Sequence, residues 1–176
     1  MNQFALDINR IRERARQHMD QGAVTDGYKA NSVDVIKVLN DVLATEIVCS
    51  LRYKRHYFMA AGIYSESVKR EFSQHALEEQ QHADMVADRI TQLNGSPDFN
   101  PQGLATRSHS EYAEGGDLIS MIKDDLYAER IAVDTYSEII RWLGNDDPTT
   151  RELMEEILKK EEEHADDMKN LLAKVG

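Results

Sequence analysis

Two short motifs of the same kind contain residues that can bind a metal ion. Each is Glu-x-x-His: Glu79 with His82, and Glu161 with His164. Residues three apart lie on the same face of an α-helix, so each motif presents a carboxylate and an imidazole to one point. A single Glu-x-x-His in a glutamate-rich helix is common by chance and usually lies on a solvated face. The two motifs therefore predict a metal site only if other residues of the sequence also point to one.

A lone glutamate precedes each motif at nearly the same distance. Glu46 lies 33 residues before Glu79, and Glu129 lies 32 residues before Glu161. If these segments are helices packed together, four carboxylates and two imidazoles converge at one place. Four buried carboxylates without cations are prohibitively unstable, because each isolated buried charge costs several kcal/mol. Two divalent cations would balance the four charges, so the repeat predicts a dinuclear metal site.

The chemistry of the donors indicates which metal this site binds. The predicted metal ligands, which are also the predicted catalytic residues together with Tyr53, are Glu46, Glu79, His82, Glu129, Glu161 and His164. Oxygen-rich sites with one imidazole per metal suit iron or manganese and leave coordination positions open, whereas cysteine-rich sites favour zinc. We expect iron, two ions per subunit, in preference to manganese.

Four residues near these motifs are candidates for supporting roles. Tyr53 lies seven residues after Glu46 and is expected to hydrogen-bond a ligand or donate an electron, with a packed core tyrosine as the alternative. Asp125, one turn before the glutamate of its own segment, is expected to orient a ligating imidazole. Cys49 is interpreted as a small buried side chain in preference to a redox group. Glu78 is expected to face water or a neighbouring subunit.

Glycine and proline divide the chain into long segments that carry these residues. The predicted helices cover 32–62, 65–95, 117–144 and 147–176. Their predicted N-terminal caps are Ser32, Ser65, Asp117 and Asp147, the last followed by Pro148. Apolar residues step alternately by three and four along each segment, with a glutamate near the middle of the row. Helices of about 28 to 30 residues are usual in a helical bundle.

The links between the four segments set the topology. Tight turns join the first helix to the second and the third to the fourth, so each pair forms an antiparallel hairpin. Residues 95–116 are long enough to cross from one end of a bundle to the other. We therefore predict an all-α fold, an antiparallel four-helix bundle over 32–176 with one long crossover between the second and third helices. We expect residues 1–31 to form an N-terminal arm, with a short helix over 4–20 followed by a hinge.

Composition restricts the functions open to the chain. Among 176 residues, 32 acids outnumber 21 lysines and arginines, and the net charge of -11 agrees with cation binding and argues against wholesale wrapping by nucleic acid. No apolar stretch is long enough to span a membrane, and the N-terminus meets a charge too early for a signal peptide. The single cysteine cannot form an internal disulfide. We expect a cytoplasmic protein without a membrane partner.

One segment of the N-terminal arm is basic, in contrast to the negative net charge of the whole chain. Its four arginines are Arg10, Arg12, Arg14 and Arg16. Such a segment could contact the phosphates of DNA. The alternative is an amphipathic arm that packs on a neighbouring subunit through Phe4, Ile8 and Ile11, or that pairs with acidic surface.

From about residue 32 to 175 the sequence resembles the bacterioferritin branch of the ferritin superfamily, including Dps-like members with a bacterioferritin-type iron centre. The six predicted ligands fall on the family's ferroxidase ligands, with Glu79 and Glu161 in the bridging positions and Tyr53 on the nearby tyrosine. The resemblance implies a ferritin-like bundle and oxidation of Fe(II) by dioxygen or hydrogen peroxide. It also implies storage of ferric mineral in a hollow homo-oligomeric shell.

Two departures from the bacterioferritin pattern matter. Gln80 stands where bacterioferritins have a haem-ligating methionine, so we expect no haem. The chain ends twelve residues after His164, without the family's short fifth helix, and has an extra N-terminal arm. Both features resemble the twelve-subunit Dps-like proteins, so a dodecamer is expected in preference to a 24-mer. The cysteine pair of many of those proteins is missing, since Cys49 is the only cysteine.

Other functions could use similar residues. A rubrerythrin-like peroxidase or a manganese catalase needs nearly the same ligands, although rubrerythrins usually add a rubredoxin-like module with four cysteines. A DNA-binding protective shell would depend more on the arginines of the arm than on oxidation. A structural bundle without metal is the plainest alternative. We expect a ferroxidase that stores iron and protects against oxidative damage.

Overall fold

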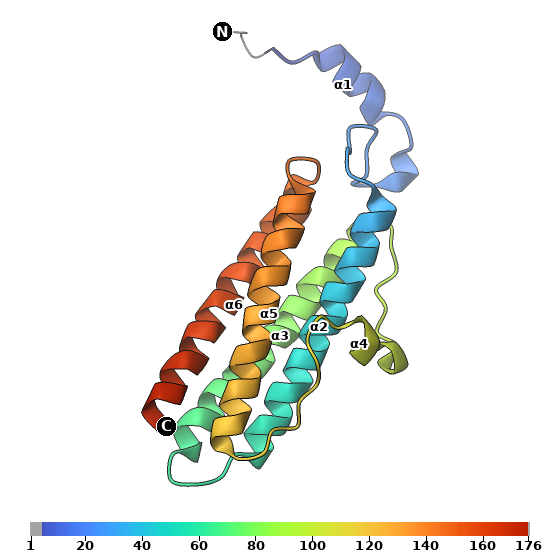
Figure 1. Ribbon diagram of the computed structural model, residues 1–176. Coiled ribbons are helices and arrows are strands. Elements are labelled where there is room, and N and C mark those ends of the chain that lie inside the picture. The colour runs from blue at the N-terminus through green and yellow to red at the C-terminus, as the bar shows by residue number, and fades with distance from the viewer. Residues whose placement is uncertain (1–4, 176) are drawn as a thin grey trace.

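The computed structural model describes residues 5–175, and that range contains helices and no strands (Figure 1). The bundle helices are α2 (Ser32–Met59), α3 (Ser65–Gln92), α5 (Leu118–Leu143) and α6 (Pro148–Val175). The shorter elements are α1 (Ile8–Ala15), the 3-10 helix η1 (Met19–Gln21) and α4 (Pro101–Arg107). Helices α2 and α3 form one hairpin, α5 and α6 form another, and the crossover between them runs beside α2. The predicted antiparallel four-helix bundle is confirmed.

The bundle helices begin close to the predicted residues. Asp117 and Asp147 cap α5 and α6 as predicted, each accepting a hydrogen bond from a backbone N–H three residues on. At α2 the predicted cap Ser32 is wrong by one residue, because the side chain of Asn31 accepts hydrogen bonds from two free backbone N–H groups of the first turn. At α3 the predicted cap Ser65 is the first helical residue, and no side chain caps the helix.

The crossover contains a short helix that the sequence analysis did not predict. Helix α4 begins after Asn100, whose side chain caps it, and has Pro101 at its first position. Leu104 of α4 is buried in a small apolar cluster with Ala44 and Val48 of α2. This contact anchors the crossover to α2.

The apolar core of the bundle is divided into two clusters. The cluster nearer the start of α2 includes Val35, Leu39, Ile90, Tyr136 and Ile157. The cluster nearer the end of α2 includes Tyr53, Phe72, Ile122, Met168 and Leu171. Between them along the four helices lie Glu46, Glu79, Glu129 and Glu161, each of them 1% exposed. A buried polar layer therefore separates the two apolar clusters at mid-bundle.

Helix α1 of the N-terminal arm lies apart from the bundle, whereas the end of the arm packs on it, where the Tyr28 hydroxyl donates to Asp147 Oδ2 at 2.7 Å. Helix α1 has no buried residue, and Figure 1 shows it extending beyond the end at which α2 begins. It is shorter than predicted, because Asp7 caps its start and His18, beyond its end, has a left-handed backbone conformation. Of the residues expected to pack on a neighbour, Ile8 is 48% exposed, and Phe4 lies outside the described residues. None of the helices in the described range has the length and apolar content that a bilayer-spanning segment needs.

A network of buried charges lies between α2 and α5. Asp125 Oδ1 accepts a hydrogen bond of 2.9 Å from Arg52 Nε, and Asp125 Oδ2 lies 2.8 Å from His56 Nδ1. His56 is not one of the predicted ligands, so the expectation that Asp125 orients a ligating imidazole is wrong. Its carboxylate instead neutralises Arg52, whose buried charge would be very costly without a partner. Cys49 accepts a hydrogen bond from Arg52 in this network, and burial raises the pKa of its thiol.

Candidate metal centre

The six predicted ligand residues meet at mid-bundle, where they form two overlapping groups that could hold a metal ion. The first group is Glu46, Glu79, His82 and Glu161, and the second is Glu79, Glu129, Glu161 and His164. Within each group the candidate ligand atoms lie within 4.8 Å of one another, and every member is buried. Because Glu79 and Glu161 belong to both groups, the geometry offers two cation positions with two carboxylates in common.

The imidazoles of both histidines point into the carboxylates. His82 Nδ1 lies 3.0 Å from Glu161 Oε1 and 3.2 Å from Glu46 Oε2. His164 Nδ1 lies 3.2 Å from Glu79 Oε1 and 3.6 Å from Glu161 Oε2. The buried atoms of this cluster without a hydrogen bond within the described residues are Glu79 Oε1, Glu129 Oε2, Glu161 Oε1 and His164 Nδ1. Buried polar atoms rarely lack a partner, so their convergence fits a bound cation.

Glu46 and Glu129 each belong to only one of the two groups and are called the outer glutamates below. Each of them accepts a hydrogen bond from a tyrosine of the other hairpin. The Tyr53 hydroxyl on α2 donates to Glu129 Oε1 on α5 at 2.5 Å, and the Tyr136 hydroxyl on α5 donates to Glu46 on α2. Each tyrosine lies seven residues after the glutamate of its own helix and bonds the glutamate of the other hairpin. Tyr53 therefore makes the kind of hydrogen bond expected of it. The role of Tyr136 was missed, although its position repeats the spacing already noted for Tyr53.

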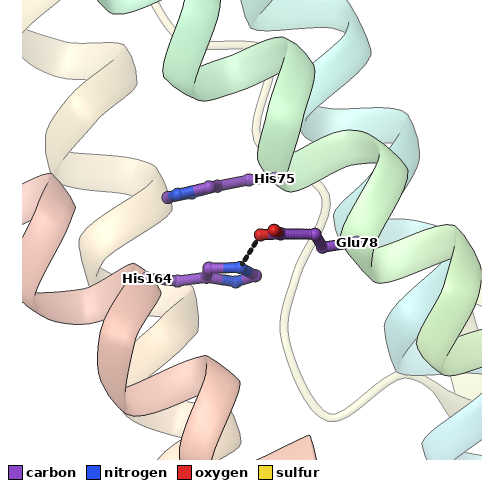
Figure 2. A group of neighbouring side chains, drawn as sticks. All are labelled: His75, Glu78 and His164. Atoms are coloured by element: carbon purple, nitrogen blue, oxygen red, sulfur yellow. Dashed lines mark hydrogen bonds and ion pairs between the residues drawn. The ribbon is translucent and has the colours of Figure 1, made fainter.

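Two further residues hold the outer side of His164 (Figure 2). Glu78 Oε2 lies 2.7 Å from His164 Nε2, so the imidazole donates its Nε2 proton there and turns Nδ1 toward the carboxylates. The prediction that Glu78 faces water or a subunit is therefore wrong. His75 is stacked on His164 with ring centroids 3.9 Å apart, and His75 Nδ1 lies 3.2 Å from the Tyr53 hydroxyl. Sequence analysis missed His75, although its position one turn before Glu79 could have indicated it.

Electrostatics divides the four glutamates into two pairs. Burial raises the pKa of Glu46 and Glu129 well above the ordinary range, and the charges of Glu79 and Glu161 raise it further. Burial also opposes the charging of Glu79 and Glu161, but the attraction of the two nearby imidazoles outweighs it and lowers the pKa of both carboxyls. Glu79 and Glu161 are therefore the more acidic pair, and Glu46 and Glu129 are the pair that resists ionisation.

The histidines of the polar layer differ in the pKa of their imidazoles. Burial lowers the pKa of His82 and His164, but close contacts with the carboxylates, first of all with Glu161, more than offset it. The pKa of His164 rises to about 12. Burial lowers the pKa of His75 to about 4, and the positive charge of His164 contributes to that shift. A divalent cation that enters the six-residue cluster has to displace the protons of its imidazoles.

Comparisons with known proteins agree with this architecture. The family described as ferritin-like domain matches residues 36–175. The chain belongs to the ferritin-like family. The match covers the four bundle helices and leaves the N-terminal arm of this ferritin-like protein outside it.

Individual relatives of the ferritin-like protein are of two kinds. The bacterioferritin of Brucella melitensis is 31% identical over 149 residues, which are 81% of this chain and 86% of the relative. The nutrient stress-induced DNA-binding protein of a Nostoc species is 30% identical over 143 residues, 80% of this chain and 78% of the relative. A solved structure, the dodecameric thioferritin described as the bacterioferritin-related protein from Bacteroides fragilis, matches with a TM-score of 0.80 and 30% identity. That match covers 84% of this chain and 89% of the other.

Removing one tyrosine hydroxyl should weaken metal binding at the centre of this ferritin-like protein. Tyr136→Phe takes a hydrogen bond from Glu46, and Tyr53→Phe takes one from Glu129. We expect either variant to lower the affinity for Mn(II) about 10-fold or more, as measured by anaerobic titration. Tyr127→Phe, at an exposed position on α5, is the matched control and should bind as the wild type does. Wild-type affinity in the Tyr136→Phe variant would contradict the role given to its hydroxyl.

Metal binding to the ferritin-like centre should release protons. The raised pKa values of His82 and His164 mean that both imidazoles hold protons at neutral pH in the metal-free chain. Two divalent cations should displace at least two protons per subunit, about one from each histidine, and affinity should fall as the pH falls because protons then compete better. Calorimetric titration with Mn(II) in buffers of different ionisation enthalpy measures the number. Binding without proton release would argue against His82 and His164 as ligands.

Proposed function

We propose that this protein is a ferroxidase that binds two Fe(II) ions per subunit as its substrate, through Glu46, Glu79, His82, Glu129, Glu161 and His164. The observation that carries the proposal is the pair of overlapping buried groups that share Glu79 and Glu161. A donor set of carboxylates and imidazoles without thiolates suits iron. Manganese is the alternative occupant, and elemental analysis of the purified protein distinguishes the two metals.

The electrons and protons of the proposed oxidation balance with iron and the oxidant alone, so no further redox group is needed. Two Fe(II) ions lose one electron each, and hydrogen peroxide takes up two electrons and two protons to give two water molecules. Dioxygen, as the alternative oxidant, takes up two electrons and two protons to give hydrogen peroxide. The carboxylates favour the higher charge of the Fe(III) product by Coulomb attraction. The shared carboxylates hold both ions side by side, so that peroxide can receive two electrons together and no hydroxyl radical is released.

Storage of the ferric product would require a hollow assembly of several chains. We propose a shell of twelve copies, because the thioferritin from Bacteroides fragilis, with 30% identity and 84% of this chain covered, is described as dodecameric. Large apolar side chains are exposed on α2 and α3, including Leu51, Phe58 and Leu77. Exposed apolar patches are typical of surfaces that contact another protein chain.

A second function, contact with DNA, is favoured by the N-terminal arm. Helix α1 extends away from the bundle, and none of the ion pairs among the described residues involves its arginines. The relative from Nostoc is named as a DNA-binding protein. We propose that the arm contacts DNA phosphates, so that the shell would protect DNA both by this contact and by consuming peroxide and Fe(II).

Glu79→Gln should abolish fast oxidation of Fe(II), because a shared carboxylate is lost while the shape of the side chain is kept. Stopped-flow absorbance after mixing two Fe(II) per subunit with peroxide or dioxygen measures the initial rate. Glu162→Gln, at an exposed position on α6, is the matched control and should keep the wild-type rate. If the Glu79→Gln protein is folded by circular dichroism and its initial rate is unchanged, the assignment of this centre fails.

Native mass spectrometry should find a single assembly of twelve chains. Because one chain has a mass of 20.1 kDa, the expected mass is about 240 kDa. A mass about twice as large would indicate a 24-subunit shell, and a mass near 40 kDa would indicate a dimer that encloses no cavity. Either result would refute the proposed dodecamer and leave the oxidation chemistry to be judged by the kinetic experiment.

DNA binding by the arm should depend on its arginines and on salt. Gel-shift titration should show loss of binding when four residues are replaced by glutamine, namely Arg10, Arg12, Arg14 and Arg16. Wild-type affinity should fall steeply as salt rises, because phosphate contacts release counterions. The matched control replaces four exposed lysines of the bundle by glutamine, namely Lys37, Lys54, Lys123 and Lys159. Equal DNA binding by the arginine variant and the wild type would rule out the arm as the contact.

A further inference from the structure

A groove lies on the face of the bundle between α2 and α5, where the crossover runs beside α2 (Figure 1). Its volume is about 440 Å³, which is within the range of small-molecule sites. Val38 of α2 and Ile139 of α5 form part of its lining. Asp41 of α2, His109 of the crossover and Trp142 of α5 line it with groups that can contact a charged ligand. The groove is separate from the metal centre, because none of the six candidate ligands lines it.

The hydrogen bonds of Thr45 show which nitrogen of His109 is available to a ligand. The Thr45 hydroxyl donates its proton to the backbone carbonyl of Asp41 at 2.9 Å. In the 3.0 Å contact between this hydroxyl and His109 Nδ1, the ring is therefore the donor. Burial lowers the pKa of His109, although the charge of Asp41 opposes that shift, so the ring is neutral at neutral pH. Its Nε2 then carries a lone pair, which no hydrogen bond among the described residues uses.

Asp41 and Trp142 favour a positively charged ligand in this groove. The carboxylate of Asp41 is half-buried and forms no ion pair or hydrogen bond with another side chain of the described residues. Glu138 also lines the groove, but it is paired with Arg141. Trp142 is 52% exposed, and no cation of the described range lies over its ring. Because the face of an indole ring attracts cations, the ring and the Asp41 carboxylate favour the same kind of ligand.

A second, smaller hollow also has Trp142 in its lining. Its volume is about 180 Å³, and its charged residues are Lys29, Asp34 and Asp146, so one net negative charge remains there. Asp34 and Asp41 lie seven residues apart on the same face of α2. Two helical turns separate them by about 10 Å along the helix axis. The two hollows therefore present negative charge at two places about 10 Å apart, with the indole ring in the lining of both.

The spacing of these acids suits an organic cation better than a metal ion. Within the described residues, the groups of ligand atoms that lie within 4.8 Å of one another include neither Asp34 nor Asp41 nor His109. A metal ion needs several ligand atoms at about 2.0–2.6 Å, whereas an ammonium group is satisfied by one or two acceptors and an aromatic face. Val38 lies between the two aspartates on α2 and offers an apolar contact to the chain that joins two such groups.

We propose that this surface binds an aliphatic polyamine, with one ammonium group between Asp41 and His109 Nε2 and a second near Asp34. The aliphatic chain passes over Trp142 and Val38. The ligand links α2, α5 and the crossover, so its binding stabilises the folded chain. This site goes beyond the ferroxidase function and does not rest on it.

Trp142 reports binding directly, because it is the only tryptophan in the chain. Titration of the assembled protein with diaminooctane should change the Trp142 emission in a saturable way, with one ligand per subunit by calorimetry. Diaminobutane carries the same charges on a shorter chain, and octylamine carries one charge on a chain of the same length. Each should bind several-fold more weakly than diaminooctane. Equal affinities for the three amines, or no saturable change with diaminooctane, would refute the site.

Asp41→Asn tests the contact with the ligand, because it removes the charge and nearly keeps the shape of the side chain. We expect diaminooctane to bind this variant several-fold more weakly and to raise its melting temperature less than that of the wild type. The matched control Glu162→Gln removes an exposed acid of α6 and should bind as the wild type does. Wild-type affinity in an Asp41→Asn protein that is folded by circular dichroism would overturn the proposal.

Fe(II) oxidation separates this proposal from the ferroxidase function. The Asp41→Asn variant should oxidise Fe(II) at the wild-type initial rate, because Asp41 is not among the six candidate ligands. If the wild type binds diaminooctane and oxidises no Fe(II), the ferroxidase function fails and the polyamine site stands. If Glu79→Gln abolishes oxidation and the wild type does not bind diaminooctane, only the polyamine site fails.

Discussion

The rest of the structure depends on four carboxylates buried within reach of one another. Packing cannot offset their repulsion and lost hydration, so positive charge must lie among them, as protons on the imidazoles or as divalent cations. This constraint accounts for one glutamate at the middle of each long helix and for the division of the apolar core into two clusters. It also accounts for the length of the helices, since each must carry apolar residues on both sides of the polar layer.

The crosswise tyrosine bonds make each hairpin depend on the other. The Tyr53 hydroxyl completes the surroundings of Glu129, and the Tyr136 hydroxyl completes those of Glu46. Each outer glutamate receives its tyrosine hydrogen bond from the other hairpin, so the full set of bonds forms only when the two hairpins dock in one register. The crossover favours that register, because α4 is packed on α2 and limits where α5 can begin. Fold and site are therefore specified by the same contacts.

Residues that follow helical periodicity could be predicted from the sequence, and residues whose partners lie on another helix could not. The six centre residues lie on inward rows, and Tyr136 was predictable from the spacing of Tyr53. Asp125 and Glu78 were misassigned because periodicity gives the face of a helix and not the neighbour that meets it. Asp125 meets an arginine of α2, and Glu78 meets His164 of α6. Helix α4 was missed because its seven residues are too few for a periodic pattern.

The internal repeat is kept at the candidate ligands and lost around them, so the surroundings of the centre differ between the two halves of the bundle. The position equivalent to Glu78 is Lys160, and the position equivalent to His75 is Ile157. Apolar side chains on the Ile157 side make any path for a charged ion costly there. On the other side, the stacked imidazoles and the half-exposed Asp167 provide polar groups from the centre to the surface. The two sides of the centre therefore differ in polarity although the six candidate ligands repeat, because the repeat is constrained only where side chains face the buried carboxylates.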